Sequence, residues 1–202
     1  MSEPREIVIA SRNKGKLAEI LQIYHDLPAR WTTVADYPKA PEVEETGKTF
    51  AANAKKKAVA IAKFTGQWAL ADDSGLEVDA LKGGPGVNSA MYAGKHGADH
   101  ANNEKLLKEL SKVPDAKRTA RYRAVIVVAT PDGEILAEAD GHCEGMIGRE
   151  YKGSSGFGYD PLFVVPEFGQ TMAELGLEFK NRISHRAMAL ERLREQLAPR
   201  LV

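Results

Sequence analysis

The amino-acid sequence predicts an α/β fold built on a mixed β-sheet. Short apolar runs rich in β-branched residues alternate along the chain with segments whose apolar residues recur at helical spacing. The turn at residues 131–133 joins two long strand patterns, 121–130 and 134–146, which indicates an antiparallel hairpin. Because the alternation favours parallel pairing and the hairpin adds antiparallel pairing, we expect a mixed sheet.

The first predicted unit is a strand, a polar loop and a helix. Residues 7–10 are apolar and end abruptly at the polar run 11–16. After that run, apolar residues recur at helical spacing from Leu17 to Tyr24. In α/β sheets, polar loops that follow strands are where ligands usually bind, so this loop is a candidate binding segment.

Further elements follow in order. Thr49 is placed to cap a helix whose apolar stripe runs from Phe50 to Ile61, and residues 68–71 form a strand pattern that we expect to end in a loop at 72–75. Later patterns predict a helix around residues 106–110, a strand at 161–165 and a final helix that begins after Ser184.

Composition limits the classes of protein. The 202 residues contain no linker-like stretch, so we expect a single domain over 1–202. The 28 basic residues balance the 28 acidic ones, which gives no reason to expect nucleic-acid or membrane partners. The single cysteine, Cys143, excludes an intrachain disulfide, and the absence of a signal-like or membrane-spanning apolar run predicts a cytoplasmic protein.

The loop after the first strand contains residues suited to phosphate. Ser11, Asn13, Lys14 and Lys16 lie where a helix begins, so backbone N–H groups, the helix dipole and two ammonium groups can converge on phosphate oxygens. An ordinary helix cap with solvated lysines explains the same residues. The loop does not match the Walker pattern.

Four carboxylates lie in predicted loops rather than along helices: Glu44, Glu45, Asp72 and Asp73. Magnesium prefers such hard oxygen ligands, together with water and substrate phosphates. For the two glutamates, a solvated acidic face explains the pattern as well as a metal site does. The adjacent Asp72 and Asp73 would repel each other at a partly desolvated strand end, which a cation or a basic partner would relieve.

Two later segments complete the candidate site. In the glycine-rich loop 153–160, Phe157 and Tyr159 offer flat surfaces for a purine, although both side chains could equally pack into the core. Near the last helix, Lys180, His185 and Arg186 lie within seven residues. The last two would stand in a first helical turn, where cations are disfavoured unless an anion or an electron-rich acceptor is near.

Taken together, these segments resemble the inosine triphosphate pyrophosphatase family. The matching stretches, in the family's order, are residues 11–16, 44–50, 71–76, 156–161 and 180–186. The resemblance implies an elongated α/β mixed sheet flanked by helices, with two lobes and a central cleft, and a homodimer. It also implies Mg²⁺ as cofactor and hydrolysis of the triphosphates of inosine, deoxyinosine and xanthosine to the monophosphate and pyrophosphate.

The resemblance also assigns roles to residues of this chain. Asp73 would be the catalytic base and a metal ligand, and Glu44 or Glu45 would complete the magnesium site. The phosphates and sugar would be held by Ser11, Arg12, Asn13, Lys14, Gly15, Lys16, Ser74 and Lys180. The base would be held by Phe157, Gly158, Tyr159 and Asp160, and its edge by His185 and Arg186.

The chain departs from the family's pattern at one position, and two alternative functions remain open. Met91 stands where bacterial members of the family have arginine, so a contact made by that arginine cannot be transferred to this chain. A pyrophosphatase for modified pyrimidine nucleotides is the alternative enzyme, because a related family has a similar fold. A regulatory nucleotide-binding module that has lost catalysis is the alternative from another class, and the intact Asp72–Asp73 pair argues against it.

Overall fold

The computed structural model describes residues 4–201, and the chain divides into two compact units. The first unit comprises residues 4–73, 124–141 and 186–201, and the second comprises residues 74–123 and 142–185. The chain passes from one unit to the other within three long strands and at the peptide bond between His185 and Arg186. Two candidate segments are therefore divided between the units: Asp73 belongs to the first unit and Ser74 to the second, and His185 belongs to the second unit and Arg186 to the first.

The sheet of the first unit has the strand order β2-β1-β3-β5-β6. Its strands are β1 (Arg5–Ile9), β2 (Ala29–Thr33), the first part of β3 (Trp68–Val78), the second part of β5 (Thr119–Ala129) and the first part of β6 (Ile135–Ile147). Strand β1 is parallel to both of its neighbours. A short turn joins β5 to β6, as the sequence predicts, so the sheet is mixed.

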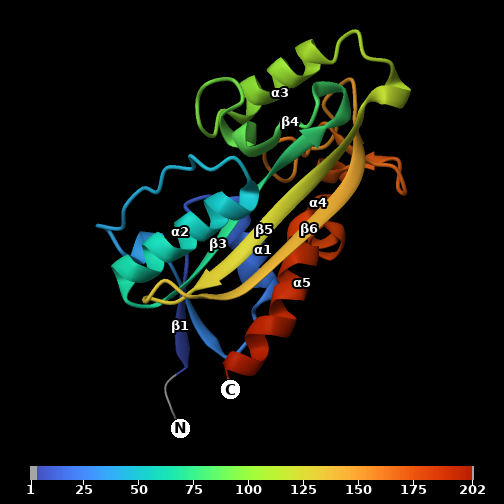
Figure 1. Cartoon of the computed structure of the whole chain (residues 1–202). Coiled ribbons are helices and arrows are strands. Elements are labelled where there is room, and N and C mark those ends of the chain that lie inside the picture. Colours follow the sequence, from blue (N-terminus) through green and yellow to red (C-terminus); the bar gives the residue numbers. More distant parts are fainter. Residues whose placement is uncertain (1–3, 202) are drawn as a thin grey trace. The chain divides into compact units, whose positions relative to one another are not determined.

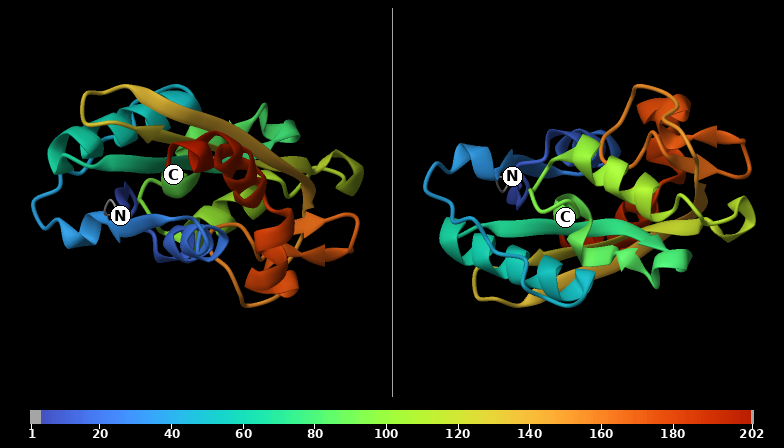
Figure 2. Two further views of the ribbon diagram at one scale, coloured as in Figure 1. Left: turned by 90° about the horizontal axis from the view of Figure 1, so that it is seen from below. Right: turned by 90° about the horizontal axis from the view of Figure 1, so that it is seen from above.

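Helices cover both faces of this sheet (Figures 1 and 2). Helices α1 (Lys14–Ile23) and α5 (His185–Leu197) pack on one face, where residues such as Ile20 and Leu190 join Leu70 in the core. Helix α2 (Phe50–Thr65) lies on the other face. It begins at the Thr49 cap, whose side chain accepts a hydrogen bond from the Ala52 N–H, as predicted.

The second unit contains the other parts of the three long strands. There β4 (Gly84–Pro85) pairs with β3, and β7 (Phe163–Val165) with β8 (Gln170–Thr171) extends the sheet beyond β6. Helices α3 (Asp99–Glu109) and α4 (Met172–Ile183) contribute Leu106 and Met172 to an apolar core that also includes Tyr122 and Phe163.

The prediction of a loop at residues 72–75 is wrong. Strand β3 continues through Asp72 and Asp73 to Val78. Strand patterns are recognised from apolar residues, and the two aspartates interrupt that pattern although both are buried, at 2% and 4% exposure. The acidic run therefore lies inside the sheet, where side chains of successive residues point to opposite faces.

None of the helices within residues 4–201 combines the length and the apolar content that a membrane span requires.

Candidate functional site

The predicted phosphate loop caps helix α1. The Asn13 side chain accepts a hydrogen bond from the Lys16 N–H at 3.1 Å, and its carbonyl oxygen accepts one from the Leu17 N–H. Ser11 stabilises the loop by accepting from the Asn13 N–H. Within residues 4–201, the backbone N–H groups of Lys14 and Gly15 make no hydrogen bond, so they remain available to an anion at the positive end of the helix.

The loop's two lysines have different surroundings. Lys14 is exposed, whereas Lys16 is mostly buried and its ammonium group contacts the Asp72 carboxylate. Burial lowers the pKa of Lys16, and Asp72 opposes that effect. Arg12 is exposed and donates a hydrogen bond to the Ala40 carbonyl at 3.4 Å. Lys14 is therefore the more accessible of the two ammonium groups, and Lys16 is the one with a fixed orientation.

Asp72 belongs to a buried charge network on the α1–α5 face of the sheet. Arg186 donates from Nε to its Oδ2 at 3.0 Å and also contacts Glu19, and all three side chains are about 99% buried or more. Although burial opposes ionisation, Arg186 and Lys16 hold the pKa of Asp72 well below its usual range. Asp72 is therefore ionised at neutral pH, and its carboxylate is paired with Arg186 and Lys16.

Asp73 lies on the other face and has a different environment. Its Oδ2 atom is buried and has no hydrogen-bond partner among residues 4–201. Burial, followed by the nearby charge of Glu45, raises the pKa of Asp73 to about 6. The charges of Lys16 and Lys57 and a hydrogen bond with Asn53 offset this shift only in part, so Asp73, unlike Asp72, keeps a buried oxygen that a further cation would stabilise.

Helix α2 positions the predicted metal ligands. Its Lys57 contacts the Glu45 carboxylate and donates to the Asp72 carbonyl at 2.8 Å, while its Lys56 donates to the Glu44 carbonyl at 2.8 Å. Its Asn53 accepts from the Gly47 N–H at 2.7 Å. Both glutamates are exposed, but the Glu45 side chain is paired with Lys57 and its charge raises the pKa of Asp73, whereas Glu44 is held through its backbone carbonyl.

The donor set is compatible with magnesium. In the described part of the chain, no three His, Cys, Asp or Glu side chains form a cluster able to hold a metal ion. Asp73 and Glu45 provide two carboxylates, and the unsatisfied Oδ2 of Asp73 is an open ligand position. Magnesium is commonly bound by one or two carboxylates and completes its octahedron with water and substrate phosphates, so the two residues fit this ion.

In the second unit, Asp160 organises the glycine-rich loop. Its Oδ2 accepts from the Phe157 N–H at 2.9 Å and from the Lys180 ammonium at 2.6 Å. The Lys180 Nζ lies 4.2 Å from the centre of the half-buried Phe157 ring. Gly158 is anchored by Asn103, which donates to its carbonyl at 2.8 Å. The loop thus presents an aromatic face and an ammonium group in a fixed relation.

Two other predicted base-binding residues are buried in the second unit. Tyr159 is 4% exposed, belongs to the apolar core and donates to the Ser89 carbonyl at 2.8 Å. His185 is 3% exposed and its ring stacks on that of Tyr122. Ser74, the first residue of this unit, is partly buried in β3.

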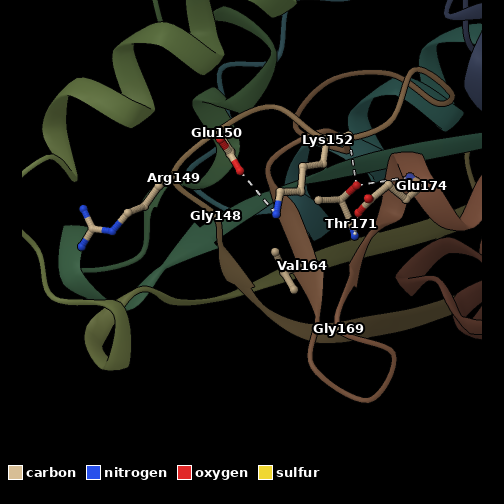
Figure 3. Close-up of a pocket in the computed structure, with 8 residues that line it drawn as sticks. All are labelled: Gly148, Arg149, Glu150, Lys152, Val164, Gly169, Thr171 and Glu174. Carbon is tan, nitrogen blue, oxygen red and sulfur yellow. Dashed lines mark hydrogen bonds and ion pairs between the residues drawn. The ribbon is translucent and has the colours of Figure 1, made fainter.

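A separate hollow in the second unit has a volume of about 190 Å³ (Figure 3). Its charged and polar groups are paired: Lys152 with Glu150 at 3.4 Å, Thr171 with Glu174 in the capping box of α4, and Arg149 with Asp115 outside the hollow. Small-molecule sites usually have roughly 300 Å³ or more. None of the predicted site residues lines this hollow.

Sequence reasoning missed several residues that the structure connects to these sites. Lys57 is one of three consecutive lysines in a helix, a pattern typical of a solvated face. Glu19 is next to the core residue Ile20, and Tyr122 is at an inward position of β5, so both look like ordinary helix and strand residues. Their partners are far away in the chain, so no local pattern could have indicated these contacts.

The fold and these sites define a mixed α/β protein with two features. The loop that caps α1 offers backbone N–H groups to an anion, and a pair of carboxylates suits a divalent cation. Comparison with known proteins makes the assignment specific. The profile of the Ham1 family matches residues 7–196, and the chain belongs to this family.

Curated relatives support this membership over nearly the full chain. A dITP/XTP pyrophosphatase from Desulforamulus reducens is 55% identical over 192 residues, 95% of each chain. One from Geobacter sulfurreducens is 53% identical over 95% of this chain and 96% of its own. The structure of a HAM1 protein from Coxiella burnetii matches with a TM-score of 0.87 and 44% identity, covering 96% of this chain and 99% of that one.

Proposed function

We propose that this chain is a magnesium-dependent nucleoside triphosphate pyrophosphatase. It hydrolyses the triphosphates of inosine, deoxyinosine and xanthosine to the nucleoside monophosphate and pyrophosphate, and so removes non-standard purine nucleotides. The observation that carries the proposal is the buried Asp73 with an unsatisfied Oδ2 beside Glu45, in a chain whose relatives are named dITP/XTP pyrophosphatases.

Asp73 acts as the general base. It accepts a proton from a water molecule, whose oxygen attacks the α-phosphorus while pyrophosphate leaves. In the metal-free site, burial and Glu45 raise the pKa of Asp73 to about 6, so this carboxylate is more basic than an ordinary aspartate and is still largely ionised at neutral pH. Asp72 cannot take this role, because Arg186 and Lys16 occupy its carboxylate.

The metal site consists of Asp73 and Glu45. Magnesium bound there would neutralise triphosphate charge and help to orient the attacking water. We favour Glu45 over Glu44 as the second ligand, because Glu45 is the carboxylate whose charge raises the pKa of Asp73. Lys57, which contacts Glu45, keeps this carboxylate in place.

Residues of the first unit bind phosphate. The N–H groups of Lys14 and Gly15 and the Lys14 ammonium hold phosphate oxygens, while Lys16 provides a fixed positive charge. Such contacts lower the barrier when they strengthen as charge develops in the transition state.

The second unit supplies base recognition. Phe157 provides the stacking face, because its ring is half-buried, whereas the Tyr159 ring belongs to the apolar core and its hydroxyl is bound to the Ser89 carbonyl. Hypoxanthine and xanthine have a carbonyl oxygen at position six, where adenine has an amino group. An N–H of His185 donates a hydrogen bond to that oxygen but faces another donor in adenine, which weakens adenine binding by about 1 to 3 kcal/mol. Arg186, which the family resemblance also places at the base edge, has its guanidinium paired with the carboxylates of Asp72 and Glu19. We therefore propose that it acts by fixing Asp72.

A panel of nucleoside triphosphates tests the proposed activity. Pyrophosphate release is measured for inosine, xanthosine, adenosine, guanosine and modified pyrimidine triphosphates with magnesium present. We expect the first two to be the preferred substrates. Preference for the pyrimidine nucleotides would favour the alternative enzyme, and tight binding without pyrophosphate release would favour a regulatory module.

Three variants test the residue assignments. Asp73→Asn should lower kcat by about 100-fold or more, the usual size of a general-base contribution, and full turnover by this variant would contradict the mechanism. Glu45→Gln and Glu44→Gln form a matched pair of neighbouring substitutions. We expect only Glu45→Gln to raise the magnesium concentration needed for half-maximal activity, and equal behaviour of the two would contradict the metal assignment.

We also propose that the protein is a homodimer, as the family resemblance implies. Light scattering coupled to size-exclusion chromatography measures the mass in solution directly. A monomer of 22.0 kDa at micromolar concentration would contradict this proposal.

A further inference from the structure

Tyr122 contacts two residues that we assign to base recognition. It lies in the second-unit part of β5 and is 7% exposed. Its hydroxyl donates to Oδ1 of Asp160 at 3.2 Å. Its ring stacks on the His185 ring, with centroids 4.7 Å apart and an interplanar angle of 16°. One buried side chain thus contacts both the loop anchor and the proposed base-edge donor.

The contact with Asp160 is important because each oxygen of this carboxylate has its own role. Oδ2 holds the Phe157 N–H and the Lys180 ammonium, which are the groups that present the aromatic face. Oδ1 receives the Tyr122 hydroxyl. A hydrogen bond to Oδ1 restricts rotation of the carboxylate and therefore restricts the position of Oδ2. The orientation of the base-stacking loop depends on Tyr122 through this carboxylate.

The residue type is itself informative. Position 122 is in an apolar core, and the Tyr122 ring lies 4.4 Å from that of Phe163. Phenylalanine would fill such a position without burying a polar atom, whereas a buried hydroxyl must find a hydrogen-bond partner. The hydroxyl of Tyr122 has an acceptor in Asp160, so its presence connects the core to the loop.

We propose that Tyr122 is a positioning residue for purine recognition. Its hydroxyl orients the Asp160 carboxylate and its ring orients the His185 imidazole, so that Phe157 and His185 meet the base in a fixed relation. This inference rests on the proposed function, since it concerns the base-recognition residues of the same enzyme. It assigns Tyr122 no contact with the substrate and no part in the chemical step.

Tyr122→Phe separates the two contacts, because it removes the hydroxyl and keeps the ring. We expect KM for inosine triphosphate to rise about 5- to 10-fold, the size of one buried hydrogen bond, while kcat changes by less than about 2-fold. Tyr122→Leu also removes the ring. For this variant we expect an additional loss of about 10-fold in the preference for inosine over adenosine triphosphate.

Tyr24→Phe is the matched control. Tyr24 is fully buried in the first unit and donates its hydroxyl to the Leu190 carbonyl at 2.8 Å, so the substitution also removes one buried hydrogen bond. We expect it to lower the melting temperature by a few degrees without changing KM. An equal rise in KM for Tyr24→Phe and Tyr122→Phe would show that general destabilisation is the cause, and would overturn the proposal.

A binding measurement distinguishes failure of this inference from failure of the proposed activity. Titration calorimetry with inosine monophosphate and adenosine monophosphate needs no turnover. We expect Tyr122→Phe to weaken inosine monophosphate binding by the same 5- to 10-fold. Wild-type affinities in Tyr122→Phe would overturn the positioning role whatever the wild-type activity is. If Tyr122→Leu does not fold, Tyr122→Phe and its control still decide the question.

Discussion

Asp72 and Asp73 show how much two adjacent residues of the same type can differ. Side chains alternate across a strand, so Asp72 shares a face with Leu70 and meets Arg186, while Asp73 faces α2 and Glu45. The expectation of a strand end is therefore wrong, whereas the expected basic partner is present for Asp72, which pairs with Arg186 and Lys16. The charge of Asp72 is neutralised within the core, whereas Asp73 keeps a buried carboxylate oxygen that has no hydrogen-bond partner among the described residues.

The buried network around Asp72 leads to a stability prediction. Arg186→Met removes the cation between Asp72 and Glu19 and leaves their carboxylates buried, so we expect a loss of about 3 to 5 kcal/mol in the free energy of unfolding. Glu19→Gln keeps the Arg186–Asp72 pair and should cost less. Urea denaturation measures both, and a larger loss for Glu19→Gln would contradict the assigned network.

Cys143 leads to a prediction about pH. Burial, followed by the charge of Glu144, raises the pKa of its thiol to about 11, above the ~8.5 of an unfolded chain. The folded state therefore favours the neutral thiol. Its contribution to stability is complete below about pH 8.5 and is lost as the pH rises toward 11. Between pH 8 and pH 10, urea denaturation should show a larger fall in unfolding free energy for the wild type than for Cys143→Ala. Parallel falls would exclude this effect.

At the scale of elements, the glycine-rich loop and its anchor must fit each other. Gly156 has φ +81°, and a Cβ atom there would lie 2.2 Å from Oδ2 of Asp160, the atom that holds Phe157 and Lys180. Gly169 has a similar φ of +63° but no atom within 4 Å of such a Cβ. An alanine would therefore be strained by the backbone angle at both positions, but it would clash with a neighbouring side chain only at position 156.

We expect Gly156→Ala to raise KM for inosine triphosphate by about 10-fold or more, because a displaced Asp160 loses charge-assisted hydrogen bonds. Gly169→Ala should cost only about 1 to 2 kcal/mol of stability, from the left-handed backbone, and leave KM unchanged. Steady-state kinetics on both variants check this pair. Unchanged KM in Gly156→Ala would mean that the loop does not depend on the Asp160 anchor.

At the scale of the whole molecule, β3, β5 and β6 belong to both compact units. A strand that loses its pairing in one unit is continuous with paired strand in the other, so we expect the two units to unfold in one cooperative transition. The chain contains a reporter in each unit. Both tryptophans, Trp31 and Trp68, are in the first unit, and the buried Cys143 is in the second.

Tryptophan fluorescence and the reactivity of Cys143 toward a thiol reagent at pH 8 can therefore be followed in the same urea series. The thiol should be unreactive while folded, since it is buried and its pKa is raised to about 11. We expect the two midpoints to coincide. Exposure of Cys143 at a lower urea concentration than the fluorescence change would show that the second unit unfolds independently.

The sequence alone determined much about this protein. Periodicity identified β1, α1, α2, the β5–β6 hairpin and α5, because these elements follow local apolar patterns. Five polar segments in the order of a known family indicated the chemistry, and the family is confirmed. The sequence also indicated Asp73 and the glycine-rich loop as candidates, since unusual residue types in an otherwise apolar or glycine-rich context are visible locally.

Only the tertiary structure decided how these residues differ. Asp72 meets Arg186 across 114 positions of sequence, and Tyr122 meets Asp160 across 38. The ionisation of a carboxylate depends on burial and on nearby charges, and both are set by elements that pack together from distant parts of the chain. The acidic run is therefore recognisable from the sequence, whereas the difference between its two carboxylates, one paired with buried cations and one with an unsatisfied buried oxygen, requires the folded sheet.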